Sequence, residues 1–67
     1  MMKRKIETIT IFSEDVGFYT STCYAEDEIG NKWIFRGYGS TEERAENVAE
    51  NRFNAEDWSR VGELMKV

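Results

Sequence analysis

The stretch Trp33–Phe53, WIFRGYGSTEERAENVAENRF, carries the most informative pattern in the chain. It opens with a short aromatic run that ends in Gly37 and Gly39, and it then takes on a helical period. Apolar residues recur at the spacing of one helix face, at Ala45, Val48, Ala49 and Phe53. This period predicts a helix over about residues 41–53 that packs on a sheet, and its two alanines favour close packing.

The start of this helix has the spacing of a capping box. In that motif the Ser40 hydroxyl accepts from the backbone three residues later, and the Glu43 side chain reaches back to Ser40. Acidic residues in the first turn also suit the positive end of the helix dipole. We therefore expect Ser40 to be the N-cap.

Three segments rich in β-branched and aromatic residues come before the helix. They predict strands over about residues 5–12, 17–26 and 32–38, joined by polar turns that contain Gly17 and Gly30. Consecutive strands with short connections form an antiparallel meander.

Side-chain alternation assigns residues to the two faces of this sheet. We expect the helix to cover the face of the second strand that carries the small residues at 21, 23 and 25. In the first strand, alternation places Ile9 and Ile11 on one face, and Ile6 and Phe12 on the other.

The helical period breaks at Asn54, which we interpret as a kink or a new N-cap. We expect a second short helix over about residues 55–65, with Ala55–Lys66 folded back on the sheet. Its packing residues would be Trp58, Val61 and Leu64 or Met65. The predicted fold is thus α+β in a single domain, residues 1–67: a three-stranded antiparallel meander with a helix on one face (β-β-β-α), plus a short C-terminal helical segment.

Length and composition limit the stabilising devices of this domain. A chain of 67 residues buries only about 60% of its unfolded surface, so its core is small. One cysteine and no histidine exclude an internal disulfide and a Cys/His zinc site. Aromatic side chains or a second copy of the chain would then supplement the core, and a homodimer is one expectation.

Charge and hydropathy bear on partners and location. The net charge of −4 disfavours a phosphate-binding surface and favours a protein partner with a basic surface. No apolar run approaches the roughly 18 residues of a membrane span, so we expect no membrane association. The lone Cys23 and the absence of an apolar signal segment after MMKRK predict a cytoplasmic protein.

The residues that catalysis commonly uses are scarce. There is no histidine, no serine elbow and no glycine-rich phosphate loop, so we predict a protein that is not an enzyme and has no cofactor. The acidic run Glu26-Asp27-Glu28 lacks the ligand spacing of a calcium loop, and we interpret it as a solvated turn rather than a metal site. We interpret Cys23 as a small core residue.

The pattern Gly37-x-Gly39-x-Thr41-Glu42-Glu43-x-Ala45-x-x-x-Ala49 resembles the C-terminal half of a double-stranded RNA-binding domain. The resemblance implies the β-β-β-α arrangement. In that family two lysines at the helix start contact phosphates, whereas Glu42 and Glu43 stand at those positions here.

Two further RNA contacts of that family also lack their counterparts. The loop that reaches a minor groove corresponds to the acidic Ser13-Glu14-Asp15, and the first helix would precede Ile6, where five residues stand. Carboxylates repel the RNA backbone, so we expect no duplex RNA binding in the family's mode. The spacing Gly-x-x-x-Glu-Glu-x-Ala also resembles HicB-type antitoxins more weakly, without the proline-containing turn of that family.

Two sets of charged residues are candidate binding sites. Glutamates on one flank of the predicted helix would bind a basic protein surface, or would simply be a solvated face: Glu42, Glu43, Glu46 and Glu50. Basic residues would form a nucleic-acid-binding patch if the first and third strands lie close together: Lys3, Arg4, Lys5, Lys32 and Arg36. Single-stranded nucleic acid would then stack on Trp33, Phe35 or Tyr38, although core packing is the commoner use of such residues.

We therefore predict a small acidic macromolecule-binding protein, a regulator or inhibitor that acts through protein–protein interaction. The binding surface would be the acidic helix flank or the exposed sheet face. The alternatives are a nucleic-acid-binding module and an antitoxin-like partner.

Overall fold

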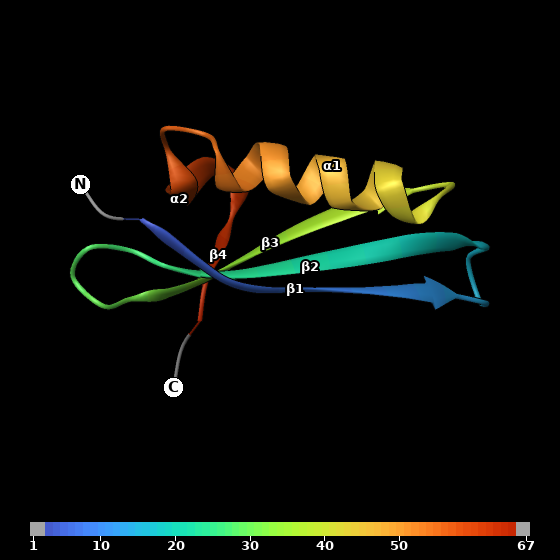
Figure 1. Cartoon of the computed structure of the whole chain (residues 1–67), viewed down its shortest axis with the longest axis horizontal. Coiled ribbons are helices and arrows are strands. Elements are labelled where there is room, and N and C mark those ends of the chain that lie inside the picture. Colours follow the sequence, from blue (N-terminus) through green and yellow to red (C-terminus); the bar gives the residue numbers. More distant parts are fainter. Residues whose placement is uncertain (1–2, 66–67) are drawn as a thin grey trace.

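The fold is a small antiparallel sheet with helices on one side. The computed structural model describes residues 3–65. The elements run in the order β1 (Arg4–Ser13), β2 (Phe18–Glu26), β3 (Lys32–Gly39), α1 (Glu42–Phe53), α2 (Trp58–Val61) and β4 (Glu63–Leu64). Figure 1 shows both helices above the strands. The predicted α+β arrangement, three antiparallel strands followed by a helix packed on them, is confirmed.

The strands lie in the order β1-β2-β3-β4, and each neighbouring pair is antiparallel. Gly17 closes the β1–β2 turn at φ 74°, and Gly30 lies in the β2–β3 turn at φ 93°. Both are left-handed backbone conformations that favour glycine, as the turn chemistry of the sequence predicts. The register pairs Thr8 with Cys23 and Cys23 with Phe35, so these three residues lie on the same face of the sheet.

Helix α1 packs against β3 backbone to backbone. A Cβ added at Gly37 would lie 2.2 Å from the carbonyl oxygen of Ala45 and 2.4 Å from the amide nitrogen of Ala49. Ala45 and Ala49 are themselves fully buried. Gly37 has no side chain and the two alanines have the smallest one, so the helix can lie this close to the sheet.

The core lies between α1, α2 and the covered sheet face. Phe35 is its largest fully buried side chain, and the rings of Trp58 and Phe53 lie 4.8 Å and 6.2 Å from it, centroid to centroid. On β2 the covered positions are the small residues predicted from the sequence, and all are fully buried: Ser21, Cys23 and Ala25.

The N-cap of α1 is Thr41, and the prediction of Ser40 is wrong. The Thr41 hydroxyl accepts a hydrogen bond from the amide of Arg44 at 3.1 Å. Serine and threonine both serve as N-caps, so packing decides between them. A Cβ at Gly39 would lie 2.7 Å from the amide nitrogen of Ala45, and this close approach fixes where the chain enters the helix.

The C-terminal region is not the helix over 55–65 that the sequence predicts. Asn54 is the C-cap of α1, and Asp57 is the N-cap of a helix of only four residues. The chain then pairs with the edge of β3 as β4, where the amide of Met65 donates to the carbonyl of Lys32 at 2.9 Å. Hydrogen bonds to this edge replace those that a longer helix would make.

Packing explains why α2 ends at Gly62. A Cβ there would lie 2.4 Å from the ring of Phe35, so the glycine lets this buried ring reach the chain. Of the residues expected to pack on the sheet, Trp58 is buried and Val61 contacts the core, whereas Leu64 and Met65 are exposed. Lys66, the end of the predicted fold-back, lies outside the described residues.

A β-bulge in β1 changes which face Ile6 occupies. The register shifts between Lys5 and Glu7, so Ile6 is the extra residue. Ile6 consequently lines the same surface hollow as Ile9, on the side of the sheet away from α1. The prediction that Ile6 shares a face with Phe12 is wrong, because regular alternation does not pass through a bulge.

We expect Gly37→Ala to destabilise the fold by about 3 kcal/mol, because the new methyl group would overlap the backbone of α1 rather than a movable side chain. For a domain of this size, that loss lowers Tm by more than about 10 °C. Thermal melting followed by circular dichroism measures it. Thr22→Ala, on the side of the neighbouring strand that faces away from α1, is the control. Equal effects of the two substitutions would contradict this account of the packing.

We expect Trp58→Ala to cost about 3–5 kcal/mol, because the side chain is 4% exposed and closes the core over Phe35. Its ring nitrogen also donates to the carbonyl of Phe53 at 2.7 Å. Chemical denaturation gives the free energy of unfolding. Leu64→Ala, at an exposed position of the same segment, should cost far less; a Trp58→Ala loss below about 1 kcal/mol would refute the role of this segment in the core.

Candidate functional site

The four glutamates of the predicted acidic flank have different environments. Glu42 and Glu43 are exposed in the first turn of α1. Glu46 is half-buried and accepts from the Thr10 hydroxyl at 3.0 Å. Glu50 forms an ion pair with Lys5 on β1, and this hydrogen bond raises the pKa of Lys5. Half of the flank therefore contacts β1, and only its first two glutamates are free to contact a partner.

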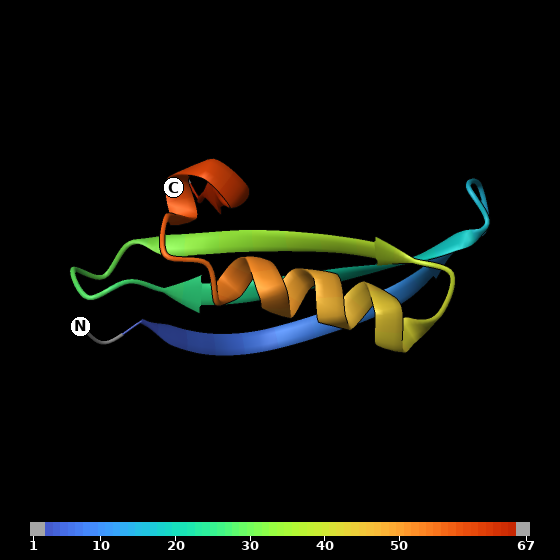
Figure 2. The ribbon, with the colours of Figure 1, turned by 90° about the horizontal axis from the view of Figure 1, so that it is seen from above.

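A second acidic segment lies at the same end of the molecule as Glu42 and Glu43. Figures 1 and 2 both show the β1–β2 turn and the start of α1 at this end. The turn carries Glu14 and Asp15, both exposed. We call these four residues the acidic end. Within residues 3–65, none of the four forms an ion pair.

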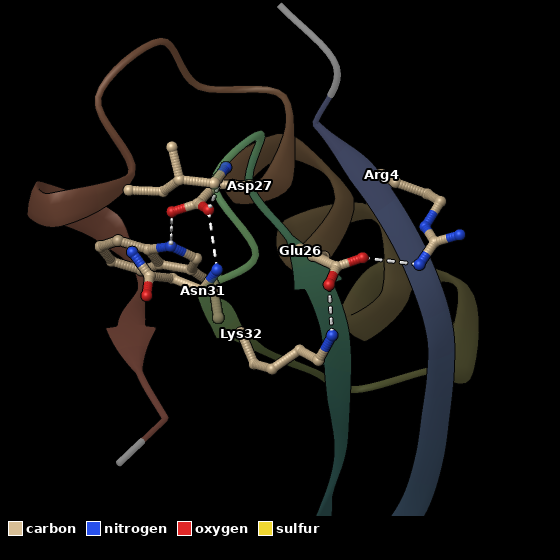
Figure 3. Close-up of polar contacts among 7 residues, drawn as sticks. Arg4, Glu26, Asp27, Asn31 and Lys32 are labelled. Atoms are coloured by element: carbon tan, nitrogen blue, oxygen red, sulfur yellow. Dashed lines mark hydrogen bonds and ion pairs between the residues drawn. The ribbon is translucent and has the colours of Figure 1, made fainter. Parts of the chain in front are cut away.

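Two of the predicted basic residues meet on one carboxylate. Arg4 from β1 and Lys32 from β3 both bind Glu26 at the end of β2, with Arg4 Nη2 2.6 Å from Glu26 Oε1 (Figure 3). The bond from Lys32 contributes most to lowering the pKa of the Glu26 carboxyl, and the bond from Arg4 lowers it further. The patch required the first and third strands to lie close together, whereas β2 lies between them and its Glu26 side chain separates the two cations.

The remaining basic residues also have partners, and they point to different sides. Lys3 lies over the Trp58 ring, 4.7 Å from its centroid, and Arg36 Nη1 lies 2.5 Å from Glu63 Oε1. Lys5 is held on the helix side by its ion pair. The five predicted residues therefore do not form one open basic patch.

The three aromatic side chains considered as stacking platforms have different exposure. Phe35 is fully buried, and Trp33 is half-buried with its ring 5.9 Å from that of Trp58. Tyr38 is exposed. Phe35 and Trp33 thus serve as packing residues, as their commoner use suggests.

The acidic β2–β3 turn is organised around Asp27. Its carboxylate accepts from the indole nitrogen of Trp33 at 3.0 Å and from the amide of Asn31 at 2.9 Å (Figure 3). These bonds lower the pKa of Asp27, and that from Trp33 contributes most. Within residues 3–65 no group of three or more metal-ligating side chains is arranged to hold an ion. Asp27 therefore anchors the turn.

Cys23 occupies the centre of the covered sheet face. It is fully buried, and burial raises the pKa of its thiol. A protonated, inaccessible thiol is a packing group rather than a nucleophile, in agreement with the interpretation from the sequence.

The sheet face opposite α1 is a further candidate surface. Strand alternation predicts only some of the side chains that lie on it. We call it the uncovered face. Figures 1 and 2 place both helices on the other side of the sheet. Large apolar side chains of β1 are exposed here: Ile6 at 48%, Ile9 at 46% and Ile11 at 60%. The sequence contains one signal of this arrangement. Regular alternation would place Ile6 on the opposite face from Ile9 and Ile11, and a one-residue bulge between them brings all three to the same face.

Comparisons of this chain with protein-family models, with curated proteins and with solved structures find no match. Among the described residues, no helix has the length and apolar character required to span a membrane.

We expect stability to fall as the pH drops through about 4, because Glu26 and Asp27 have lowered pKa values in the folded state. A lowered pKa contributes stability above the unfolded-state value of about 4, and this contribution is lost as protons bind below it. Tm measured from pH 7 to pH 3 tests this expectation.

The matched variants are Asp27→Asn and Glu28→Gln. Asp27→Asn should make Tm less dependent on pH over this range, because the titrating anchor is gone. Glu28→Gln, at an exposed neighbouring position, should leave the dependence unchanged. Identical pH profiles for Asp27→Asn and the unmodified chain would show that titration of Asp27 does not cause the pH dependence of Tm.

Proposed function

We propose that this chain is a non-enzymatic protein that binds a basic surface of another protein through its acidic end, and that it regulates or inhibits that partner. The observation that carries the proposal is the presence of four exposed carboxylates, Glu14, Asp15, Glu42 and Glu43, at one end of the molecule. An antitoxin-like role would be one case of this function.

The distribution of the other charges supports this choice of surface. Elsewhere on the sheet the cations bind carboxylates of their own chain, such as Glu26, Glu50 and Glu63. None of the four carboxylates of the acidic end forms an ion pair within residues 3–65, and the exposed Arg44 is the one cation of the first turn of α1. Excess charge of one sign on an exposed surface accelerates association with a partner of opposite sign and disfavours partners of the same sign.

The resemblance to double-stranded RNA-binding domains points in the same direction. The turn and the helix start are the regions through which that family is expected to contact RNA, and here both are acidic. Such a surface repels phosphates and is suited to basic protein groups that themselves bind phosphates. The first-turn glutamates also stabilise the helix through its dipole, so a test must separate binding from stability.

Charge reversal at the acidic end tests the proposal. We expect Glu42→Lys combined with Glu43→Lys to abolish capture of basic proteins from a native lysate by the immobilised chain. The control is Glu28→Lys combined with Glu56→Lys, which makes the same change in net charge at the opposite end. Captured proteins are compared by mass spectrometry at equal loading, and Tm confirms that each variant is folded.

Several outcomes would contradict the proposal. Equal loss of capture in both double variants would indicate a response to net charge alone. Retained capture by the Glu42/Glu43 variant would exclude the acidic end. Retention of a mixed RNA and DNA pool at low salt, lost steeply as salt rises, would instead support the nucleic-acid-binding alternative, in which Lys3 and Arg4 would take part.

A further inference from the structure

A second interaction surface lies on the other side of the sheet from α1. Strand register places Ile9 and Ile11 of β1 on this uncovered face, beside Thr22 and Thr20 of β2. Ile6 joins them through the bulge, and Tyr38 of β3 is exposed on the same face. No helix among residues 3–65 covers these side chains (Figures 1 and 2).

The exposed apolar side chains contrast with a small core. Among residues 3–65 the buried hydrophobic residues are two alanines of α1, one alanine of β2, a cysteine and two large side chains, Phe35 and Trp58. The three exposed β1 isoleucines are each larger than any of these alanines. Contiguous apolar surface of this kind on a small domain marks an interaction site.

The charges on the uncovered face are nearly balanced. Arg4 and Lys32 both bind Glu26, and Arg36 binds Glu63. Glu7 is also exposed on this face, beside Ile6 and Ile9, and forms no ion pair among residues 3–65. With Glu7 counted, three cations face three carboxylates, so two uncovered faces can meet with a net charge near zero on each. Outside this face, exposed carboxylates without an ion pair among residues 3–65 lie at the acidic end and at the opposite end, where they are Glu28, Glu56 and Asp57.

Charge also distinguishes this face from the free edge of β1. Pairing β1 with β1 of another copy would bring the two α1 helices towards each other on the β1 side. Glu46 lies on that side, since it accepts a hydrogen bond from Thr10 of β1, whereas the charge of Glu50 is compensated by Lys5. Like charges would then face one another across the two-fold axis, which disfavours association through the edge.

The uncovered face offers a larger contact area than the free edge of β1. Its three long strands, β1, β2 and β3, lie about 4.8 Å apart and are each about 30 Å long, which gives roughly 430 Å² in projection. Specific interfaces bury about 800 Å² on each partner, and the accessible area of an irregular surface exceeds its projection. An edge contact along the regular part of β1 would be about 24 Å long and one strand wide, which is much smaller.

We propose that the occupant of the uncovered face is a second copy of this chain, so that two sheets pack face to face about a two-fold axis. Aligned packing sets the strands of the two sheets at about 30° and places the β1 isoleucines of both copies in the shared interior. Both α1 helices then lie on the outside, and the dimer carries two acidic ends. This arrangement does not depend on the function proposed for the acidic end.

The test is the mass of the full chain in solution. Sedimentation equilibrium from about 1 μM to 1 mM should give twice the chain mass of 7.9 kDa at the upper concentrations. Ile11→Lys should raise the dimer dissociation constant at least 100-fold, because it places a charge in the apolar interface. Ile29→Lys makes the same substitution at a turn position that is 79% exposed, and it should leave the dissociation constant unchanged.

A milder variant guards against loss of folding. If Ile11→Lys does not melt cooperatively, Ile11→Thr keeps a β-branched side chain and should weaken the dimer about 10-fold. A chain that stays at 7.9 kDa throughout overturns the proposal. A dimer unaffected by substitution of Ile11 also overturns it, as does new amide-exchange protection confined to the free edge of β1. The Glu42/Glu43 double variant should still dimerise. Failure of the dimer proposal can therefore be told apart from failure of the binding proposed for the acidic end.

Discussion

The close approach of α1 to β3 is the contact on which the rest of the structure depends. Gly37 presents bare backbone to Ala45 and Ala49, so the helix lies nearer to the sheet than ordinary side chains allow. At this distance the helix cannot accommodate a large residue beneath it, which explains why the second strand carries Ser21, Cys23 and Ala25 there. The larger volume of Phe35 is accommodated beyond Ala49, where Phe53 and Trp58 pack around it.

Much of this arrangement could be predicted from local patterns. Strand alternation, turn glycines and the 3.6-residue period of α1 are properties of neighbouring residues, and each predicted element among β1, β2, β3 and α1 has its counterpart. The small residues of β2 also identified the covered face. The cap of α1 shifted by one residue because Ser40 and Thr41 are chemically equivalent there, and only the packing of Gly39 chooses between them.

The C-terminal segment and the bulge depend on contacts that local patterns do not contain. Trp58 and Val61 have helical spacing, but the helix stops because Gly62 lies against Phe35 and because β3 offers an open edge. Those partners are more than twenty residues away in the chain. Likewise, the candidate basic patch assumed that proximity of Arg4 and Lys32 creates a cationic surface, whereas Glu26 lies between them.

The two candidate surfaces follow from the way charge is distributed over the molecule. Cations of β1 and β3 are held by Glu26, Glu50 and Glu63, so the strands hold little net charge. The exposed carboxylates without an ion pair among residues 3–65 lie mainly beyond the two ends of the strands, and the β1–β2 turn and the start of α1 carry four of them. A face whose charges are balanced and mostly paired can bury its apolar side chains against a copy of itself, because few ions there leave water without a partner. A carboxylate-rich end can act only on something basic. A protein built this way would use the hydrophobic effect for assembly and long-range electrostatics for recognition, each on a separate surface.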